Sequence, residues 1–290
     1  MVLLITVFQA VITGLLVGGI YAAMAVGLSI IFGVMKIINV AHPAIALLCA
    51  YIAYAAFTRL GVDPVVSLVF SVPAALLIGA VMFRVLVRPI LGGPPLISLL
   101  LLFGFANFLE GVMLIGWTAD PRSLTPSYSA SSIQAGPIIL SATRLLGFVV
   151  SCLVVAALAV FLSRSFTGKA IRATMQDRQA ALLMGVNTVR VSMVAFLLGV
   201  GTTAVGGTVL GLVYAFYPAL HLLWIGKLFC IVVLGGVGSV GGVLGGAAVL
   251  GVAESLTATF FPAVWAELVA YVLLVLTLWI RPAGLFGRAA

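Results

Sequence analysis

The long apolar runs of this sequence constrain its fold more than any other feature. Residues 2–35 contain no charged residue, and seven further apolar runs follow along the chain. Apolar residues make up 64% of the sequence and charged residues only 7%, whereas soluble domains contain about 25% charged residues. So few charges cannot cover a soluble fold. The sequence therefore predicts an all-α polytopic membrane protein and excludes a soluble enzyme, a disordered chain and a secreted disulfide-rich scaffold.

The net charge of +8 does not indicate a nucleic-acid partner. Most of the 14 Lys and Arg residues lie at the ends of apolar runs, which is the distribution expected from the positive-inside rule. A nucleic-acid-binding surface would instead gather basic residues on one polar face. We therefore expect the lipid bilayer, and no nucleic acid, to surround or contact the chain.

The cysteines and histidines are scattered. Cys49, Cys152 and Cys230 lie far apart inside apolar runs, with no CxxC spacing, and His42 and His221 are isolated. This pattern predicts buried thiols without disulfides, no metal site and no bound cofactor.

The first apolar run is too long for one upright span. As a single helix, residues 2–35 would extend about 50 Å, against a hydrocarbon core of about 30 Å. We expect a break near Gly14, Gly18 and Gly19. The amino terminus lacks the basic region and cleavage pattern of a signal peptide, so we expect it to enter the membrane as a helix. The chain then forms one domain, residues 1–290, of eight to ten transmembrane helices with broken or Gly-rich segments.

Two polar stretches fix the expected topology. Residues 163–190 carry five basic residues and one acidic residue, a net charge of +4 that predicts a cytoplasmic loop. Residues 118–143 are rich in Ser, Thr and Pro, and counting spans predicts that they are extracytoplasmic. Three simple spans after Arg190 would leave Arg281 and Arg288 outside, against the charge rule. We therefore expect that residues 234–251, which contain eight glycines, form a broken or re-entrant segment.

The cytoplasmic stretch has the signals of a helix–turn–helix. Thr167 could cap a helix that runs to Met184, Gly185 could end it in a left-handed conformation, and Asn187 or Thr188 could cap the next membrane helix. The spacing of Gln179, Ala180, Ala181 and Gly185 resembles the EAA loop of ABC importer permeases. The residues expected to couple to an ATPase are Asp177, Arg178, Gln179, Ala180, Ala181, Gly185 and Asn187. An interfacial basic helix that binds lipid headgroups is the alternative.

The resemblance extends along the chain. Residues 27–42, 168–191, 233–242, 251–254 and 281–287 are similar, in the same order, to the LivH-type permeases of branched-chain amino acid transport. One departure is Pro43-Ala44-Ile45, where that family usually has Gly and a polar or acidic residue after the His.

This resemblance implies an ATP-driven importer of branched-chain or related amino acids in a bacterial-type inner membrane. Its partners would be a second permease subunit (a LivM-like paralogue or another copy), two P-loop ATPase subunits and a periplasmic or extracellular solute-binding protein. The chain itself has no Walker A sequence around Lys169 or Lys227, so ATP hydrolysis is expected in the partner subunits and this chain is not an enzyme.

The glycine-rich segment has three possible interpretations. Gly236-x-Gly238-x-x-Gly241 matches a dinucleotide fingerprint, but its flanks are membrane-length apolar runs rather than a soluble βαβ unit. Small residues spaced four apart allow close helix contact in lipid, whereas a pore element lined by backbone is the alternative. The residues expected to pack helices are Gly238, Gly241, Gly242, Gly245 and Gly246.

A few polar residues interrupt the apolar runs. Glu110 lies inside one of them, which marks it as a candidate pathway residue or as a structural acid paired with a neighbour. Asn39 and His42 at a helix break could line the pathway or bond freed backbone groups. Lys227 and Glu254 could lie at the interface or pair with each other.

The rival functions are a secondary, ion-coupled transporter and a membrane-embedded enzyme. The first would need ion-coordinating residues near the bilayer midplane, and the second would need a cluster of His, Asp or Glu. The residues alone name neither the cargo nor the identity of the partner permease.

Overall fold

The computed structural model describes residues 2–281 and 284–285, and most of them are helical. The helices are α1 (Val2–Met35), α2 (His42–Leu60), α3 (Leu68–Met82), α4 (Pro95–Trp117), α5 (Ala142–Arg164), α6 (Phe166–Gln176), α7 (Arg178–Leu183), α8 (Thr188–Val213), α9 (His221–Gly235), α10 (Val240–Phe260) and α11 (Ala263–Ile280). Turns of π- and 3-10 helix at Phe83–Val87 and Arg88–Ile90 extend α3, and a 3-10 turn at Pro218–Leu220 precedes α9.

The predicted fold class is confirmed. Within the described residues, eight helical segments are long and apolar enough to cross a membrane, and α11 is a shorter apolar helix. These nine elements fall within the predicted range of eight to ten.

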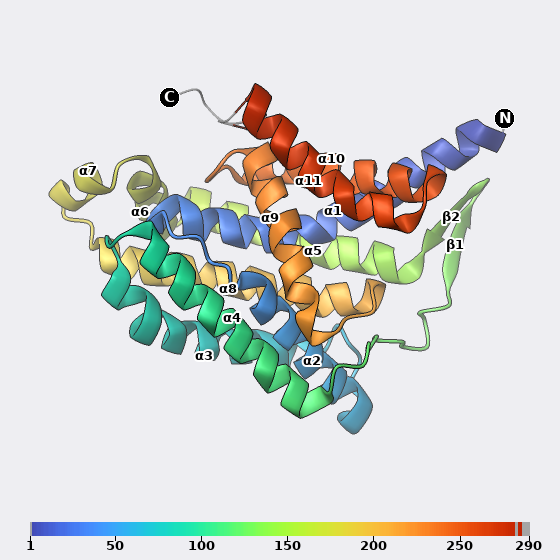
Figure 1. The fold of residues 1–290 in the computed structure, drawn as a ribbon, viewed down its shortest axis with the longest axis horizontal. Coiled ribbons are helices and arrows are strands. Elements are labelled where there is room, and N and C mark those ends of the chain that lie inside the picture. The colour runs from blue at the N-terminus through green and yellow to red at the C-terminus, as the bar shows by residue number, and fades with distance from the viewer. Residues whose placement is uncertain (1, 282–283, 286–290) are drawn as a thin grey trace.

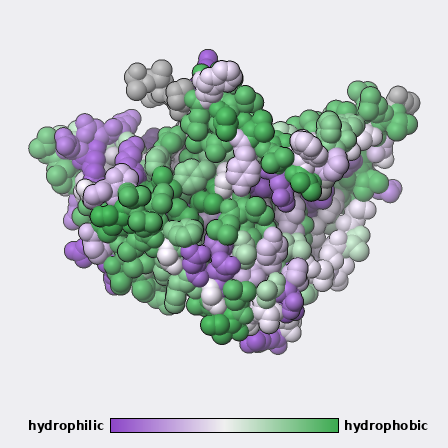
Figure 2. Space-filling model, in the orientation of Figure 1, coloured by the Kyte–Doolittle hydropathy of each residue, from purple (hydrophilic) through white to green (hydrophobic). Residues whose placement is uncertain are grey.

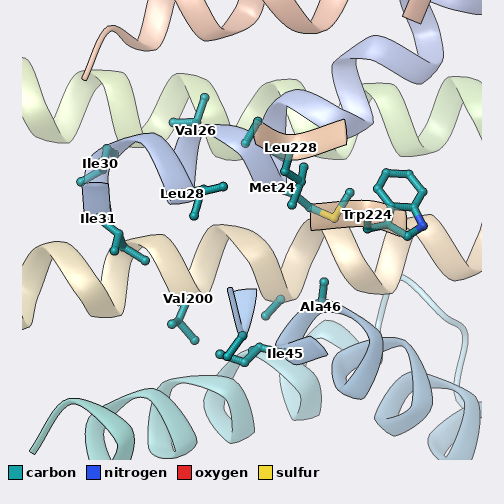
Figure 3. Packing of buried hydrophobic residues seen from close by; sticks show 14 of the residues in the cluster. Met24, Val26, Leu28, Ile30, Ile31, Ile45, Ala46, Val200, Trp224 and Leu228 are labelled. Atoms are coloured by element: carbon teal, nitrogen blue, oxygen red, sulfur yellow. The ribbon is translucent and has the colours of Figure 1, made fainter. Parts of the chain in front are cut away.

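Helix α1 is the centre of the bundle and runs unbroken for 34 residues. It packs against α10, α8, α5 and α9, and Figure 3 shows Met24, Leu28 and Ile31 among side chains from its neighbours. A helix that is apolar on every side is stable when it is buried in protein, and α1 is buried over most of residues 16–35. The break predicted near Gly14, Gly18 and Gly19 is therefore wrong.

The first two of those glycines bring α1 against α10 instead. A Cβ atom on Gly14 would lie 2.6 Å from the carbonyl oxygen of Gly251, and one on Gly18 would lie 2.6 Å from that of Ala247. Spaced four residues apart on both helices, these small residues let the backbones touch, as in tightly packed membrane helices.

Helix ends gather at two opposite faces of the bundle. Figure 1 shows α6 and α7 at one end, and the amino terminus with strands β1 (Ser132–Ala135) and β2 (Ile138–Ser141) at the other. We call the first end the basic face, because helix ends and loops there carry Lys36, Arg84, Arg88, Arg164, Lys169, Arg172, Arg178, Arg190 and Arg281. We call the second end the ribbon face.

The glycine-rich segment makes a turn at the basic face. Helix α9 ends at Gly235, α10 begins at Val240, and Gly236 and Gly238 between them have positive φ. The break expected in residues 234–251 is therefore confined to its first part, and the rest is regular helix. Because α9 and α10 are separate helices, Arg281 lies at the basic face, where the backbone N–H of Leu285 donates to Leu234 at 2.8 Å. Arg288 lies outside the described residues.

Residues 118–143 include a two-stranded β-ribbon at residues 132–141 rather than forming only a plain loop. Strands β1 and β2 pair antiparallel, with Ile133 opposite Leu140. The side chain of Gln9 bonds both the N–H and the carbonyl of Ile139, at 2.9 and 2.6 Å, which joins the start of α1 to β2. The sequence did not predict these strands.

The outer surface suits a lipid environment. Figure 2 shows hydrophobic residues over most of the visible body, while hydrophilic residues gather near α6 and α7 and in smaller patches. Long apolar side chains on α3, α4 and α11 are exposed. Together with the span lengths, this surface identifies a multi-pass membrane protein.

Candidate functional site

Within the described residues, three features are candidates for a functional site. The first is the protruding unit α6–α7 on the basic face. The second is a non-helical segment, residues 36–41, that runs back into the bundle. The third is a charged cavity between α1, α9, α10 and α11.

The α6–α7 unit is two helices, not the single helix predicted up to Met184. Ser165, rather than Thr167, caps α6 by accepting from the backbone N–H of Gly168 at 2.8 Å. Asp177 has an extended backbone conformation, which separates α6 from α7. Its carboxylate accepts hydrogen bonds from the backbone N–H groups of Gln179 and Ala180 at 2.8 and 3.0 Å and so caps α7. An aspartate cap satisfies free N–H groups and starts a new helix.

The end of α7 has the predicted left-handed glycine. Gly185 has φ +82°, and its N–H donates to Leu182 while that of Val186 donates to Ala181, which is a Schellman motif. Asn187 then caps α8 by accepting from Arg190 at 3.0 Å. Hydrogen bonds between residues close in the sequence thus fix both ends of this turn.

The accessible residues of this unit differ in part from those the sequence favoured. Ala181 is buried, while Asp177, Gln179, Ala180, Gly185 and Asn187 are exposed and Arg178 is half-buried. Leu183 and Met184 are 87% and 85% exposed, and sequence reasoning missed them. The sequence does contain a signal for them. Leu182-Leu183-Met184 is a run of three apolar residues in a basic loop, and an exposed apolar patch of this kind indicates an interaction site.

Residues 36–41 enter the bundle as a non-helical segment. Helix α1 ends at Met35, where Lys36 takes a positive φ, and α2 begins at His42. The Nε2 atom of His42 lies 3.0 Å from the carbonyl of Met24, eleven residues, or about 16 Å, before the end of α1. Nonhelical backbone at membrane depth occurs where protein or a water-filled pathway surrounds it.

Polar side chains line the inner end of this segment. His42 is fully buried and contacts the hydroxyl of Thr203 on α8. Asn39 is also fully buried, and neither atom of its amide has a hydrogen-bond partner within the described residues. The structure therefore brings Asn39 and His42 to one helix break, but His42 contacts a carbonyl in the interior of α1 rather than a backbone group freed by the break.

Glu110 lies apart from this break. Its Oε2 is 3.8 Å from Nδ1 of His221 at the start of α9, while that nitrogen also lies 3.1 Å from the carbonyl of Pro218. The partner favours the structural reading of Glu110. Within residues 2–281 and 284–285, no three His, Cys, Asp or Glu side chains lie close enough together to hold a metal ion.

The predicted packing glycines serve different purposes. A Cβ on Gly242 or Gly246 would meet the backbone of α9, at Gly235 and Ile231 respectively, so both allow the close α9–α10 hairpin. Gly238 belongs to the turn, where its N–H donates to Ser29 at 2.9 Å. Gly241 faces open space within this chain, so its predicted packing role is wrong there. Gly245 is half-buried on α10.

The charged cavity has an ion pair at its base. The Lys227 ammonium lies 3.0 Å from Oε1 of Glu254, and the Tyr21 hydroxyl donates to Oε2 of the same carboxylate at 2.9 Å. The Tyr214 hydroxyl lies 3.2 Å from that of Tyr21. Lys227 also lies 5.4 Å from the ring centre of Trp224. Tyr21 comes from α1, whereas the other members of this cluster come from residues 214–254.

Comparison with known proteins places the chain in a family. A family model described as the permease component of the branched-chain amino acid transport system matches residues 10–278. The chain belongs to this family.

Curated relatives agree along nearly the full length of this permease. It is 34% identical to the permease protein BraD of the high-affinity branched-chain amino acid transport system of Pseudomonas aeruginosa, over 97% of this chain and 95% of that protein. It is 31% identical to LivH of Salmonella typhimurium and 29% identical to LivH of Escherichia coli K12, with the same coverage. No solved structure matches the permease.

Proposed function

We propose that this permease is the membrane subunit of an ATP-driven importer of branched-chain or related amino acids. It would work in the inner membrane with a second permease subunit, two P-loop ATPase subunits and an extracytoplasmic solute-binding protein. The chain would provide the pathway and no catalytic group of its own.

The α6–α7 unit is the observation that carries this proposal. Exposed Leu183 and Met184 give it an apolar tip, and capping by Asp177 and Asn187 holds that tip in a fixed orientation on the basic face. A rigid apolar projection in a basic setting suits a groove on a soluble partner. Packing of α6 against α5, α8 and α1 would pass the partner's movement to the bundle.

The proposed cycle is alternating access. ATP binding would close the ATPase pair and pull α6–α7, so that the bundle opens toward the binding protein at the ribbon face. Hydrolysis would reset the bundle toward the cytoplasm. Asn39 and His42 are proposed to line the pathway at the break before α2, whereas Glu110 is proposed as a structural acid.

Co-purification tests the proposal. The chain is expressed with its native neighbours, solubilised in mild detergent and purified, and the bound proteins and ATPase activity are measured. We expect a P-loop subunit that is lost when Leu183→Glu or Gly185→Trp is introduced and retained with Gln176→Ala, an exposed control on α6. A chain that purifies without an ATPase, yet transports with an ion gradient, would support the secondary-carrier alternative instead.

A further inference from the structure

The charged cavity described above lies within the membrane-spanning part of the chain. Its volume is about 290 Å³, near the lower end of the range for small-molecule sites, about 300–1,000 Å³. Glu254 precedes the end of α10 by six residues, or about 9 Å, so the base of the cavity is below the ribbon face. A ligand of amino-acid size fits such a space.

Positively and negatively charged side chains both line this cavity. Lys227 and Glu254 form the mostly buried base, with side chains 16% and 10% exposed. Arg144 and Glu267 also line it, and Glu267 is exposed at the mouth. A ligand with one positive and one negative group would therefore find a charged partner for each group in this cavity.

Ion-pair energetics restrict which ligand can reach the base. Removing one partner from a buried pair leaves an uncompensated charge and is strongly unfavourable. A cation alone would pair with Glu254 and leave Lys227 in that state, and an anion alone would pair with Lys227 and leave Glu254 in that state. A zwitterion can replace both at once, with its carboxylate on Lys227 and its ammonium on Glu254.

The surroundings of the pair suit such an exchange. Lys227 lies over the rings of Trp224 and Tyr21, at 5.4 and 6.0 Å from their centres, and aromatic faces attract an ammonium group. The ligand's ammonium could use the same rings. Val17, Gly251, Ala258 and Ala266 line the cavity beside the charges and leave an apolar wall for a short aliphatic side chain.

We propose that this cavity is a binding site for a zwitterionic α-amino acid, with Lys227 as the carboxylate partner and Glu254 as the ammonium partner. Tyr21 holds the Glu254 carboxylate in place between ligands. The proposal deepens the transport function proposed above, because it names the residues of the permease that recognise the charged part of the cargo.

Binding to the purified permease complex without the solute-binding protein tests this site. Labelled L-leucine is bound in a scintillation proximity assay, and unlabelled leucine, valine, leucinamide and 4-methylpentanoate compete. We expect leucine and valine to compete, and the singly charged leucinamide and 4-methylpentanoate to be at least about tenfold weaker. Lys227→Met and Glu254→Gln are each expected to weaken leucine binding at least about tenfold.

Matched variants separate recognition from folding. Asp120→Asn removes an acid paired with Arg122 at 3.6 Å outside the cavity and should leave binding unchanged. If a single variant fails to fold, the double variant Lys227→Met/Glu254→Gln removes both charges, folds without an unpaired ion, and should still lose binding. Size-exclusion chromatography monitors folding.

Several results would overturn the site: leucine binding at the wild-type level in the double variant, equal competition by leucinamide or 4-methylpentanoate, or a wild-type complex that binds neither leucine nor valine. Leucine binding with the expected charge dependence, but without ATP-driven uptake, would support the site and contradict the proposed importer.

Discussion

At the scale of single residues, a substitution of Asn39 should affect transport and stability in different ways. Its amide is buried and has no hydrogen-bond partner within the described residues, and an unpartnered buried polar group costs stability. We expect Asn39→Leu to leave the melting temperature of the permease unchanged or raised, and to lower substrate uptake at least about tenfold, because the pathway loses a polar group. Thermal unfolding and uptake are measured on the same preparation. Normal uptake in this variant would remove Asn39 from the pathway.

Gly251 tests the close contact between α1 and α10. A Cβ there would lie 2.3 Å from the carbonyl oxygen of Gly14, so Gly251→Ala must push the helices apart. Overpacking of this kind costs about 1–3 kcal/mol, and we expect the melting temperature in detergent to fall by about 2 °C or more.

Gly241→Ala is the matched control for that prediction, because it lies on the same helix in open space. Its melting temperature should match the wild type. Equal stability of the Gly251→Ala variant would show that the α1–α10 contact is looser than the structure gives.

Sequence reasoning succeeded at residues whose signals are local. Gly185 and Asn187 end one helix and begin the next through bonds to residues within four positions. Glu254 contacts Tyr21, 233 positions away in the sequence, and no local pattern predicts such a pair. The sequence offered the Lys227–Glu254 pair as one alternative, which the structure shows, but it did not indicate that Tyr21 lies beside this pair.

At the scale of elements, Asp177 decides the shape of the α6–α7 unit. Its carboxylate caps α7, and loss of such a cap costs about 1 kcal/mol. We expect Asp177→Ala to increase hydrogen exchange and proteolysis in residues 177–185, while the melting temperature of the membrane helices stays constant.

Asp177→Asn retains an oxygen that can cap the helix and should behave as wild type. Unchanged exchange in the alanine variant would mean that packing, rather than the cap, holds α7 in place. If the orientation of the apolar tip matters, ATPase binding should be weakened by Asp177→Ala and retained with Asp177→Asn.

The longest element shows where composition misleads. A 34-residue apolar run with five glycines, three of them at positions 14, 18 and 19, suggested a broken helix, because its length was compared with bilayer thickness alone. In the structure, contacts with α10 and α8 bury α1, and Gly14 and Gly18 serve those contacts. The turn at Gly236–Gly238 was easier to predict, since dense glycine favours positive φ.

At the scale of the whole molecule, the number of membrane helices agrees with the positions of the basic residues. With α9 and α10 as two helices, Arg172 and Arg281 lie on the same basic face. We expect Arg172→Cys and Arg281→Cys to react with a membrane-impermeant maleimide only from the cytoplasmic side, and Ser131→Cys only from outside. The native cysteines are first replaced by alanine. Labelling of Arg172→Cys and Arg281→Cys from opposite sides would contradict this topology.

The bundle also fits the partner subunits proposed above. Its interior is mostly apolar, and the sequence offers no nucleotide-binding motif to supply energy. An apolar tip on the basic face and a charged cavity below the ribbon face lie toward opposite ends of the bundle. Coupling between them would travel through α1, which packs against α6, α9 and α10.

The most direct test of that account is uptake by proteoliposomes that contain the permease complex assembled with its native neighbours. Labelled leucine and the solute-binding protein are supplied outside, with ATP enclosed. The account predicts accumulation that requires both ATP and the binding protein, and that is lost with Leu183→Glu. Accumulation driven by a proton or sodium gradient without ATP, and unaffected by Leu183→Glu, would contradict it.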